Sequence, residues 1–145
     1  MNDLSRKVRL AQQVRRKVEQ CAMLHDFPED LGGLCAEASF ALLRVFKANG
    51  YKAQVACLVA DQLDEPPSIG HCWVVSDGIA FDITATQFGR RSKVYLPKSL
   101  EKYKKWISRC VGVGGQEYIS SLKMTSPLFT EKPKIAWRVQ HILSL

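Results

Sequence analysis

Apolar residues near the start of the chain recur at steps of three and four, with charged residues between them. This spacing places one apolar stripe along a helix of about five turns. The stripe consists of Leu4, Val8, Ala11, Val14, Val18 and Cys21. Asp26 and Pro28 lie where such a helix is expected to end. The pattern therefore predicts an amphipathic helix that begins after Asp3 and ends by residue 26.

A second helix is predicted from Leu34 to Ala48, after a turn-rich segment over residues 27–33. Its apolar residues lie on more than one side, which is typical of a helix with several packed neighbours. Asn49 and Gly50 supply a C-terminal cap. We expect this helix to lie in the middle of the fold.

From residue 51 onward the pattern is typical of strands joined by turns. Strands are predicted over residues 51–60 and 71–75, with a proline-containing loop over 61–70 between them. Asp77 and Gly78 are a hairpin-turn signal, and the next strand is predicted over residues 79–84. Two helices followed by neighbouring strands predict an α+β fold.

The pattern is weaker beyond residue 84. We predict a basic loop, a short strand, a helix and a glycine-rich loop over residues 84–93, 94–96, 99–109 and 111–115, respectively. The last dozen residues do not show whether they form a helix or a strand.

Length and composition predict a single domain. The chain has 145 residues, of which 46% are hydrophobic and 24% charged, as in ordinary globular domains. We divide it into a basic helix over 1–26, a core over 31–89 and basic elements over 90–145. The sequence shows neither the roughly 18 consecutive apolar residues of a membrane helix nor the apolar region of a signal peptide. We therefore expect a cytoplasmic protein without membrane association, and a specialised secretion route stays open.

The charge is unbalanced and local. Lys and Arg number 21 against 14 Asp and Glu, which gives a net charge of +7. The excess is concentrated in the first helix and in residues 90–105, where it would attract an anionic partner. The sequence carries no helix-turn-helix, zinc-finger or RNA-binding signature. An acidic protein is therefore favoured over nucleic acid as the partner.

Five cysteines at irregular spacing predict free thiols rather than a disulfide framework. Cys57 and Cys72 alternate with apolar residues of their strands and are expected in the core. Cys21 and His25 lie four residues apart on a helix and can offer two metal ligands, but no second pair has the spacing of a zinc site. We therefore predict neither a metal nor a cofactor.

Cys35 is the strongest candidate nucleophile. It lies in the first turn of the second helix, directly after Gly32, Gly33 and Leu34. The free N–H groups and the dipole of a helix N-terminus lower the pKa of a thiol. The same N–H groups can bind the oxyanion of a tetrahedral intermediate, and glycines allow a substrate to approach. We therefore place Gly33 and Leu34 in the oxyanion or substrate-binding site.

A base and an orienting carboxylate are predicted on the hairpin. A two-residue turn at Asp77 and Gly78 pairs residue 76 with 79, 75 with 80, 74 with 81, 73 with 82 and 71 with 84. His71, Trp73 and Asp82 then share one face of the sheet, with Asp82 diagonal to His71 and within hydrogen-bonding reach. Trp73 either covers the site or belongs to the core.

Residues 31–89 resemble the papain-like and transglutaminase-like cysteine enzymes. The resemblance rests on the segments Gly33-Leu34-Cys35, Gly70-His71-Cys72-Trp73-Val74-Val75 and Phe81-Asp82-Ile83-Thr84-Ala85-Thr86-Gln87-Phe88-Gly89. It implies a helix that begins with the nucleophile Cys35, packed on a sheet that carries the base His71 and the orienting group Asp82. Gln87 would contact the substrate or the triad. Residues 31–37 are also similar to the nucleophile motif of arylamine N-acetyltransferases, with Leu31 in place of their arginine.

The function predicted from these residues is acyl transfer through a thioester on Cys35. The enzyme would be a thiol hydrolase acting on a carboxamide or peptide bond, of the amidase, peptidase or protein-glutamine deamidase type, with a protein or peptide as substrate. One alternative is a catalytically silent binding module of the same fold. Another is transfer of the acyl group to an amine, as in a transglutaminase or an N-acetyltransferase. The oligomeric state stays open.

Overall fold

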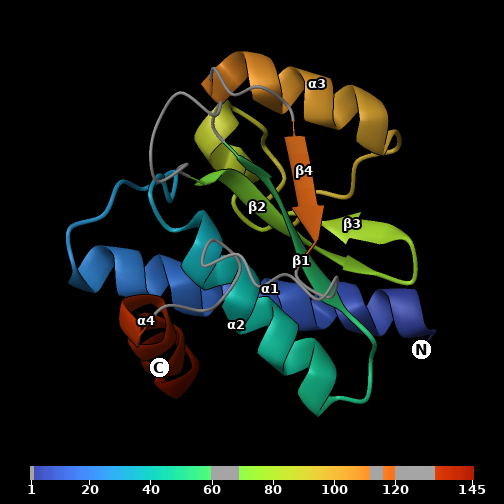
Figure 1. Cartoon of the computed structure of the whole chain (residues 1–145). Helices are drawn as coiled ribbons and strands as arrows, with labels where there is room; N and C mark the ends of the chain where they lie inside the picture. Colours follow the sequence, from blue (N-terminus) through green and yellow to red (C-terminus); the bar gives the residue numbers. More distant parts are fainter. Residues whose placement is uncertain (1, 60–68, 112–115, 120–132) are drawn as a thin grey trace.

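The computed structural model describes residues 2–59, 69–111, 116–119 and 133–145, and it has an α+β fold (Figure 1). The helices are α1 (Asp3–Leu24), α2 (Cys35–Ala48), α3 (Leu100–Val111) and α4 (Pro133–Ser144), and a 3-10 helix, η1, spans Ala85–Phe88. The strands are β1 (Gln54–Val59), β2 (Ile69–Ser76), β3 (Ile79–Phe81) and β4 (Gln116–Ile119). They form one antiparallel sheet in the order β3-β2-β1-β4.

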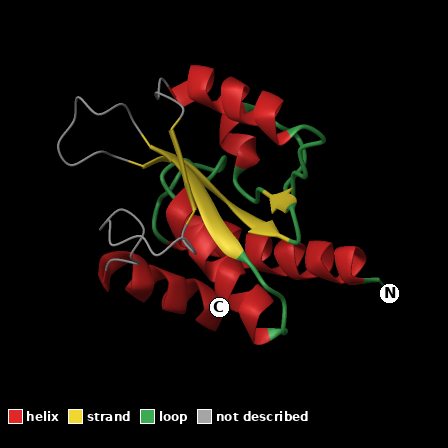
Figure 2. Ribbon diagram, turned by 45° about the vertical axis from the view of Figure 1, so that its right-hand side comes forward, coloured by secondary structure: helices red, strands yellow, loops and turns green. Residues whose placement is uncertain are grey.

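Helices cover both faces of the sheet. The helices α1, α2 and α4 lie on one side, and α3 lies on the other (Figures 1 and 2). The alternation of side chains along β2 serves both layers: Cys72 and Val74 pack with the core of α1, α2 and α4, whereas Trp73 packs with Tyr103 and Ile107 of α3. The sheet is therefore buried on both faces, with β2 in its interior.

The two N-terminal helices lie within about two residues of their predicted bounds. Ala11, Val14 and Val18 of the predicted stripe of α1 are fully or almost fully buried. Helix α2 packs against α1, α4, β1 and β2, and its Ala38 and Leu42 are completely buried. The prediction that this helix lies in the middle of the fold is confirmed.

The predicted hairpin turn is confirmed. Asp77 and Gly78 have φ angles of +50° and +75°, the left-handed conformation that a two-residue type I′ turn requires at both positions. The observed pairs are Val74 with Phe81, Val75 with Ala80 and Ser76 with Ile79, which is the predicted register. Lys7 of α1 holds the turn through an ion pair of 2.6 Å with Asp77.

The third strand is shorter than predicted, and the predicted pairs of residue 73 with 82 and 71 with 84 are wrong. Strand β3 ends at Phe81, and Asp82 instead exchanges backbone hydrogen bonds of 2.9 and 2.8 Å with Tyr95. The Asp82 side chain accepts a bond from the Thr84 N–H at 2.9 Å, which turns the chain away from β2. The residues of β2 that precede Val74, among them His71 and Cys72, are therefore not paired with β3.

The C-terminal half departs further from the sequence-based predictions. The predicted basic loop contains η1, the predicted strand over 94–96 is a single bridge at Tyr95, and the last dozen residues form α4. Strand β4 was not predicted. Residues 112–115 of the predicted glycine-rich loop and most of the predicted 61–70 loop lie outside the described residues. Among the described helices, none combines the length and apolar character needed to cross a bilayer.

Candidate active site

The loop before α2 brings Cys35 to the end of the sheet. Leu31 and Gly33 have φ angles of +67° and +86°, a conformation that suits glycine but costs energy at the buried Leu31. The Leu34 N–H donates to the Leu31 carbonyl at 3.1 Å. Leu34 is the N-cap of α2 and has no side-chain oxygen to cap the helix. The first turn of α2 therefore receives no side-chain cap from its N-cap residue.

The residues directly before Cys35 have their own contacts. The Leu34 N–H donates to the Leu31 carbonyl, and the Leu34 side chain is completely buried. Gly33 supplies the left-handed backbone angle that directs the chain into α2. The oxyanion or substrate-binding role of these two residues stays a prediction. The N–H groups that follow, from Cys35 onward, lie at the amino end of the helix.

His71 and Asp82 form a buried pair. The Nε2 atom of His71 lies 2.6 Å from the Oδ2 atom of Asp82, and both side chains are fully buried. Asp82 also accepts hydrogen bonds from the Tyr103 hydroxyl, on Oδ2, and from the Thr84 N–H, on Oδ1. Three donors thus compensate the loss of water around this carboxylate, as a buried charge requires.

The pair controls the charge of the imidazole. Burial lowers the pKa of His71, but the attraction and hydrogen bond of Asp82, together with the neighbouring Cys35, outweigh burial and raise the pKa to about 10. His71 is therefore an imidazolium at neutral pH. Because Nε2 is held by Asp82, Nδ1, which also contacts Gln87, is the nitrogen that can exchange a proton with another group.

Cys35 is half-buried and receives hydrogen bonds from two neighbours. The Cys72 thiol, the His71 ring and the Cys72 backbone N–H all donate to its sulfur, and these contacts, led by the Cys72 thiol, lower the pKa of Cys35 well below that of a free thiol, although burial opposes them. Strand β3 pairs with β2 only over residues 74–76, which leaves the edge of β2 at Cys72 available for this contact. Cys72 was expected to be core, and it is buried, but it also stabilises the thiolate.

Gln87 of η1 lies at the remaining nitrogen of the imidazole. Its Nε2 atom is 2.9 Å from Nδ1 of His71 and 3.4 Å from Oγ1 of Thr84. A neutral His71 would accept from this amide, whereas an imidazolium needs an acceptor there, which the Gln87 amide supplies after exchanging its oxygen and nitrogen positions. Gln87 therefore contacts the His71 ring in the structure.

Aromatic side chains enclose the imidazole. The ring of Phe88 meets His71 edge-on at 4.7 Å between centroids, and Trp73 lies at 6.0 Å. Trp73 is completely buried and belongs to the core under α3. Of its two predicted roles, covering the site or packing in the core, the structure shows the second. Phe88 and Tyr103 were not predicted, since nothing in their local sequence distinguishes them from ordinary core aromatics.

Arg15 of α1 positions the segment between Asp82 and Gln87. Its Nη1 atom donates to the Ile83 carbonyl at 2.8 Å and to Oγ1 of Thr86 at 2.9 Å. The side chain is buried, and it forms an ion pair of 3.4 Å with Glu19. The sequence signal was an arginine within the apolar stripe of α1, next to Val14. The positive charge of the first helix does not by itself distinguish this arginine from its exposed neighbours.

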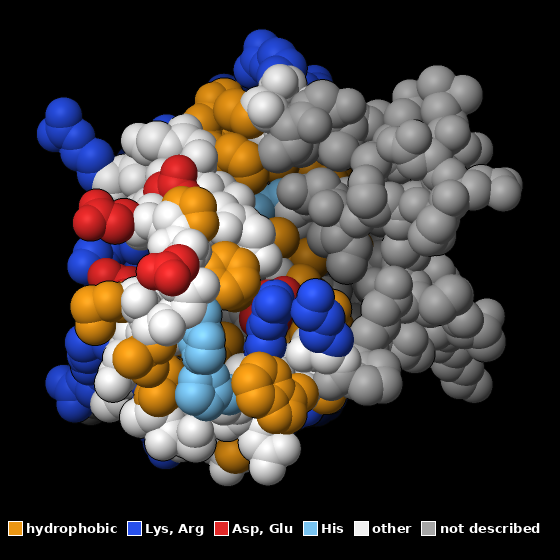
Figure 3. Space-filling view, turned by 90° about the vertical axis from the view of Figure 1, so that its left-hand side faces the viewer, with side chains coloured by type: hydrophobic (Ala, Val, Ile, Leu, Met, Phe, Trp, Pro, Cys, Tyr) orange, Lys and Arg blue, Asp and Glu red, His pale blue; other side chains and the backbone are white. Residues whose placement is uncertain are grey.

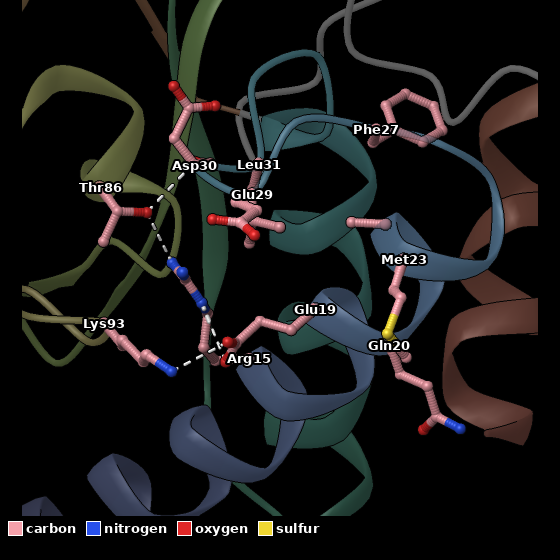
Figure 4. Close-up of a pocket in the computed structure, with 11 residues that line it drawn as sticks. Arg15, Glu19, Gln20, Met23, Phe27, Glu29, Asp30, Leu31, Thr86 and Lys93 are labelled. Carbon is pink, nitrogen blue, oxygen red and sulfur yellow. Dashed lines mark hydrogen bonds and ion pairs between the residues drawn. The ribbon is translucent and has the colours of Figure 1, made fainter.

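Arg15 also lines a cavity of about 850 Å³ (Figure 4). It is lined by α1, by the loop that contains Asp30 and Leu31, and by Thr86 and Lys93. Thr86 donates to the Asp30 carbonyl at 3.2 Å, so the cavity borders the loop that leads to Cys35. The side chains of Cys35 and His71 do not line it.

Comparison of this chain with models of known protein families, with curated proteins and with solved structures found no match. Its chemistry is therefore inferred from its own residues.

Proposed function

We propose that the protein is a cysteine-dependent acyl-transfer enzyme that hydrolyses a carboxamide or peptide bond. Cys35 is the nucleophile, His71 the acid and base, and Asp82 the group that orients the imidazole. The observation that carries the proposal is the buried hydrogen bond of 2.6 Å between His71 and Asp82, together with the position of His71 beside Cys35, whose pKa it lowers. The resemblance to papain-like and transglutaminase-like enzymes supports it, because a helix that begins at the nucleophile and packs on an antiparallel sheet is the core of that superfamily.

The reaction uses the Cys35 thiolate and the His71 imidazolium in two steps. The Cys35 thiolate attacks the carbonyl carbon, and Nδ1 of His71 gives its proton to the leaving amine or ammonia as the C–N bond breaks, leaving a thioester. Water then attacks the thioester while the now neutral His71 takes its proton. The C–S bond breaks, the carboxylic acid leaves, and the thiolate and imidazolium are restored. Asp82 keeps its charge throughout and stabilises the imidazolium.

The tetrahedral intermediate places a negative charge on the substrate oxygen. The first-turn N–H groups of α2, beginning with that of Cys35, are donors suited to it, because the N-cap residue Leu34 gives them no side-chain cap. Gln87 is a second candidate donor, since its amide lies beside Nδ1 of His71.

The burial pattern favours a slender substrate. His71 and Asp82 are fully buried, and Cys35 is the member of the triad with partial exposure. A side-chain carboxamide, such as that of glutamine, can reach a half-buried sulfur more easily than a folded backbone segment can. This argument favours an amidase or deamidase over a general peptidase. The exposed basic residues of α1 would favour an acidic protein as the substrate.

A direct experiment uses a tryptic digest of denatured cell protein as substrate. The full-length protein should release ammonia or shortened peptides, and Cys35→Ala should abolish the release. Cys110→Ala removes an exposed thiol outside the site and should leave the release unchanged. Equal release by the wild type and Cys35→Ala would contradict the proposal. Added lysine amines separate hydrolysis from transfer, because a transglutaminase would attach them to peptides.

The complete burial of His71 and Asp82 favours one competing function. A polar pair that only stabilises the fold would be enclosed in the same way, and the protein would then be a silent binding module. Such a module would bind its partner equally well when it carries Cys35→Ala. Its Cys35 would be alkylated no faster than its Cys110.

A further inference from the structure

A second cluster of reactive side chains joins the two ends of the chain, away from the proposed active site. Cys21 lies on the last turns of α1, His25 is the C-cap of that helix, and His141 lies on α4. One ligand atom from each residue lies within 4.8 Å of those of the other two. The Nε2 atoms of the two histidines are 3.0 Å apart. None of the three residues takes part in the proposed acyl transfer.

These distances fit a four-coordinate metal ion. Zinc binds histidine nitrogen at about 2.0–2.1 Å and cysteine sulfur at about 2.3 Å in a tetrahedral arrangement. That geometry requires about 3.3 Å between two ligating nitrogens and about 3.6 Å between a nitrogen and the sulfur. The observed spacing therefore needs an adjustment of a few tenths of an ångström between the histidines and a closure of up to about 1.2 Å between the Cys21 sulfur and the histidine nitrogens.

The fold holds the three ligands in place. Cys21 is buried in the core of α1, α2 and α4, and the His25 backbone N–H donates to the Cys21 carbonyl at 3.1 Å. The His141 ring stacks on Trp137, with centroids 5.7 Å apart and an angle of 11° between the rings. Two helices that are far apart in sequence thus present their donors toward one another.

A metal ion can enter the cluster from solvent, and the positive charge beside the cluster is neutralised. It lines a cavity of about 300 Å³ together with Phe27, Trp137 and Arg138, which leaves room for the ion and for water as a fourth ligand. On the face in Figure 3, a patch of histidine atoms is visible between apolar side chains. Arg138 is the neighbouring cation, and its charge is balanced by an ion pair of 3.2 Å with Glu37.

We propose that Cys21, His25 and His141 bind a zinc-like divalent ion, with water in the fourth position. The thiol loses its proton when the sulfur binds the metal, and the proton goes to solvent. The ion ties α4 to α1 across a sequence separation of more than 100 residues. It therefore stabilises the packing of the C-terminal helix, because it binds the folded chain and not the separated segments. The contact between the two imidazoles is, without metal, a single hydrogen bond.

Cobalt tests the site because its absorption reports the ligands. The full-length Cys35→Ala protein, which removes the proposed nucleophile as a competing thiolate, is titrated with Co²⁺ and then with Zn²⁺. We expect one Co²⁺ per chain, a sulfur-to-cobalt charge-transfer band, the intense visible bands of four-coordinate cobalt, and loss of both on addition of one Zn²⁺. The thermal unfolding midpoint should rise with saturating Zn²⁺.

Matched variants assign the signal to these residues. His25→Ala and His141→Ala change residues that are not in the core, and each should weaken Co²⁺ binding by at least the roughly 10–100-fold that even an outer partner of a metal site contributes. Cys21→Ser should remove the charge-transfer band. Cys110→Ser should change nothing. If Co²⁺ gives no charge-transfer band, or gives the same band and affinity in both folded histidine variants, the proposal is wrong.

Discussion

The imidazole of His71 lies 2.6 Å from the carboxylate of Asp82, and both side chains are fully buried. Such a pair is costly to bury unless each member satisfies the other. Here it leaves one imidazole nitrogen, Nδ1, for Cys35 and Gln87. The following predictions test what this pair does.

Asp82→Asn should remove the charge of the carboxylate and keep its shape. The amide can still contact His71, but the attraction that raises the pKa of His71 is lost, and burial then lowers it. The imidazolium would disappear near neutral pH, and the pKa of Cys35 would rise because the attraction of that charge is lost, although the Cys72 thiol still donates to its sulfur. We expect alkylation of Cys35 at pH 7 to slow by about tenfold or more, since one pKa unit changes the charged fraction by up to that factor. Peptide mass spectrometry after timed iodoacetamide exposure measures the rate.

The pH dependence of stability should show that Cys35 and His71 titrate as a pair. The folded pKa of His71 is raised from 6.5 to about 10, so its contribution to stability is complete below pH 6.5 and is lost as pH rises through 10. The folded pKa of Cys35 is lowered from 9.0, so its contribution is complete above pH 9 and is lost as pH falls through that lowered value.

Between pH 6.5 and 9 the effects of Cys35 and His71 on the slope of unfolding free energy against pH cancel. In that range the folded and the unfolded chain hold the same number of protons on the two residues. This pair's contribution to the unfolding free energy should be flat in that range and fall on both sides. Cys35→Ser removes the thiol whose pKa is lowered and leaves the contribution of His71. The difference in unfolding free energy between wild type and variant should therefore increase steadily from pH 6.5 to 9. Urea unfolding at several pH values measures it, and a constant difference would contradict the ion pair.

Tyr103→Phe should test the support of Asp82 from α3. The phenol donates to the carboxylate, and burial together with Asp82 raises the pKa of Tyr103, so it stays a neutral donor. Loss of a hydrogen bond to a buried charge should lower the unfolding free energy by about 1.5–3 kcal/mol. His71 and Thr84 still contact Asp82, so Cys35 should remain the fastest thiol. Tyr51→Phe, whose hydroxyl lies in an exposed contact with Asp3, is the matched control.

Arg15→Lys should show that α1 positions the site. A lysine keeps the charge but not the planar group whose Nη1 reaches both the Ile83 carbonyl and Thr86. We expect a loss of about 1–3 kcal/mol of stability and slower alkylation of Cys35, since the segment that carries Asp82 and Gln87 is less well held. Arg16→Lys changes the exposed neighbouring residue and should leave both quantities within error of the wild type.

The parts of the fold that could be predicted are those set by local sequence. The apolar stripe of α1 and the Asp77-Gly78 turn are determined by residues close in the chain, and the turn fixed the register of β2 with β3. The proximity of His71 and Asp82 was predicted correctly, although Asp82 reaches His71 from an isolated bridge with Tyr95 and not from a position in the ladder of β2 and β3.

The remainder depends on contacts between distant segments. Asp82 leaves the sheet because Tyr95 pairs with it, and Tyr103 reaches it from a helix 21 residues later. His141 meets His25 across a separation of 116 residues, so the spacing of Cys21 and His25 alone suggested only half of a ligand set. No periodicity within one segment reports such contacts.

The most direct test of the central claim is the rate at which each cysteine reacts with iodoacetamide, measured residue by residue between pH 5 and 9 in the wild type and in His71→Ala. At pH 6.5 we expect half-buried Cys35 to react faster than exposed Cys110, and we expect His71→Ala to reduce this advantage. If Cys35 reacts no faster than Cys110, or reacts equally fast without His71, then Asp82, His71 and Cys35 do not form an activated nucleophile.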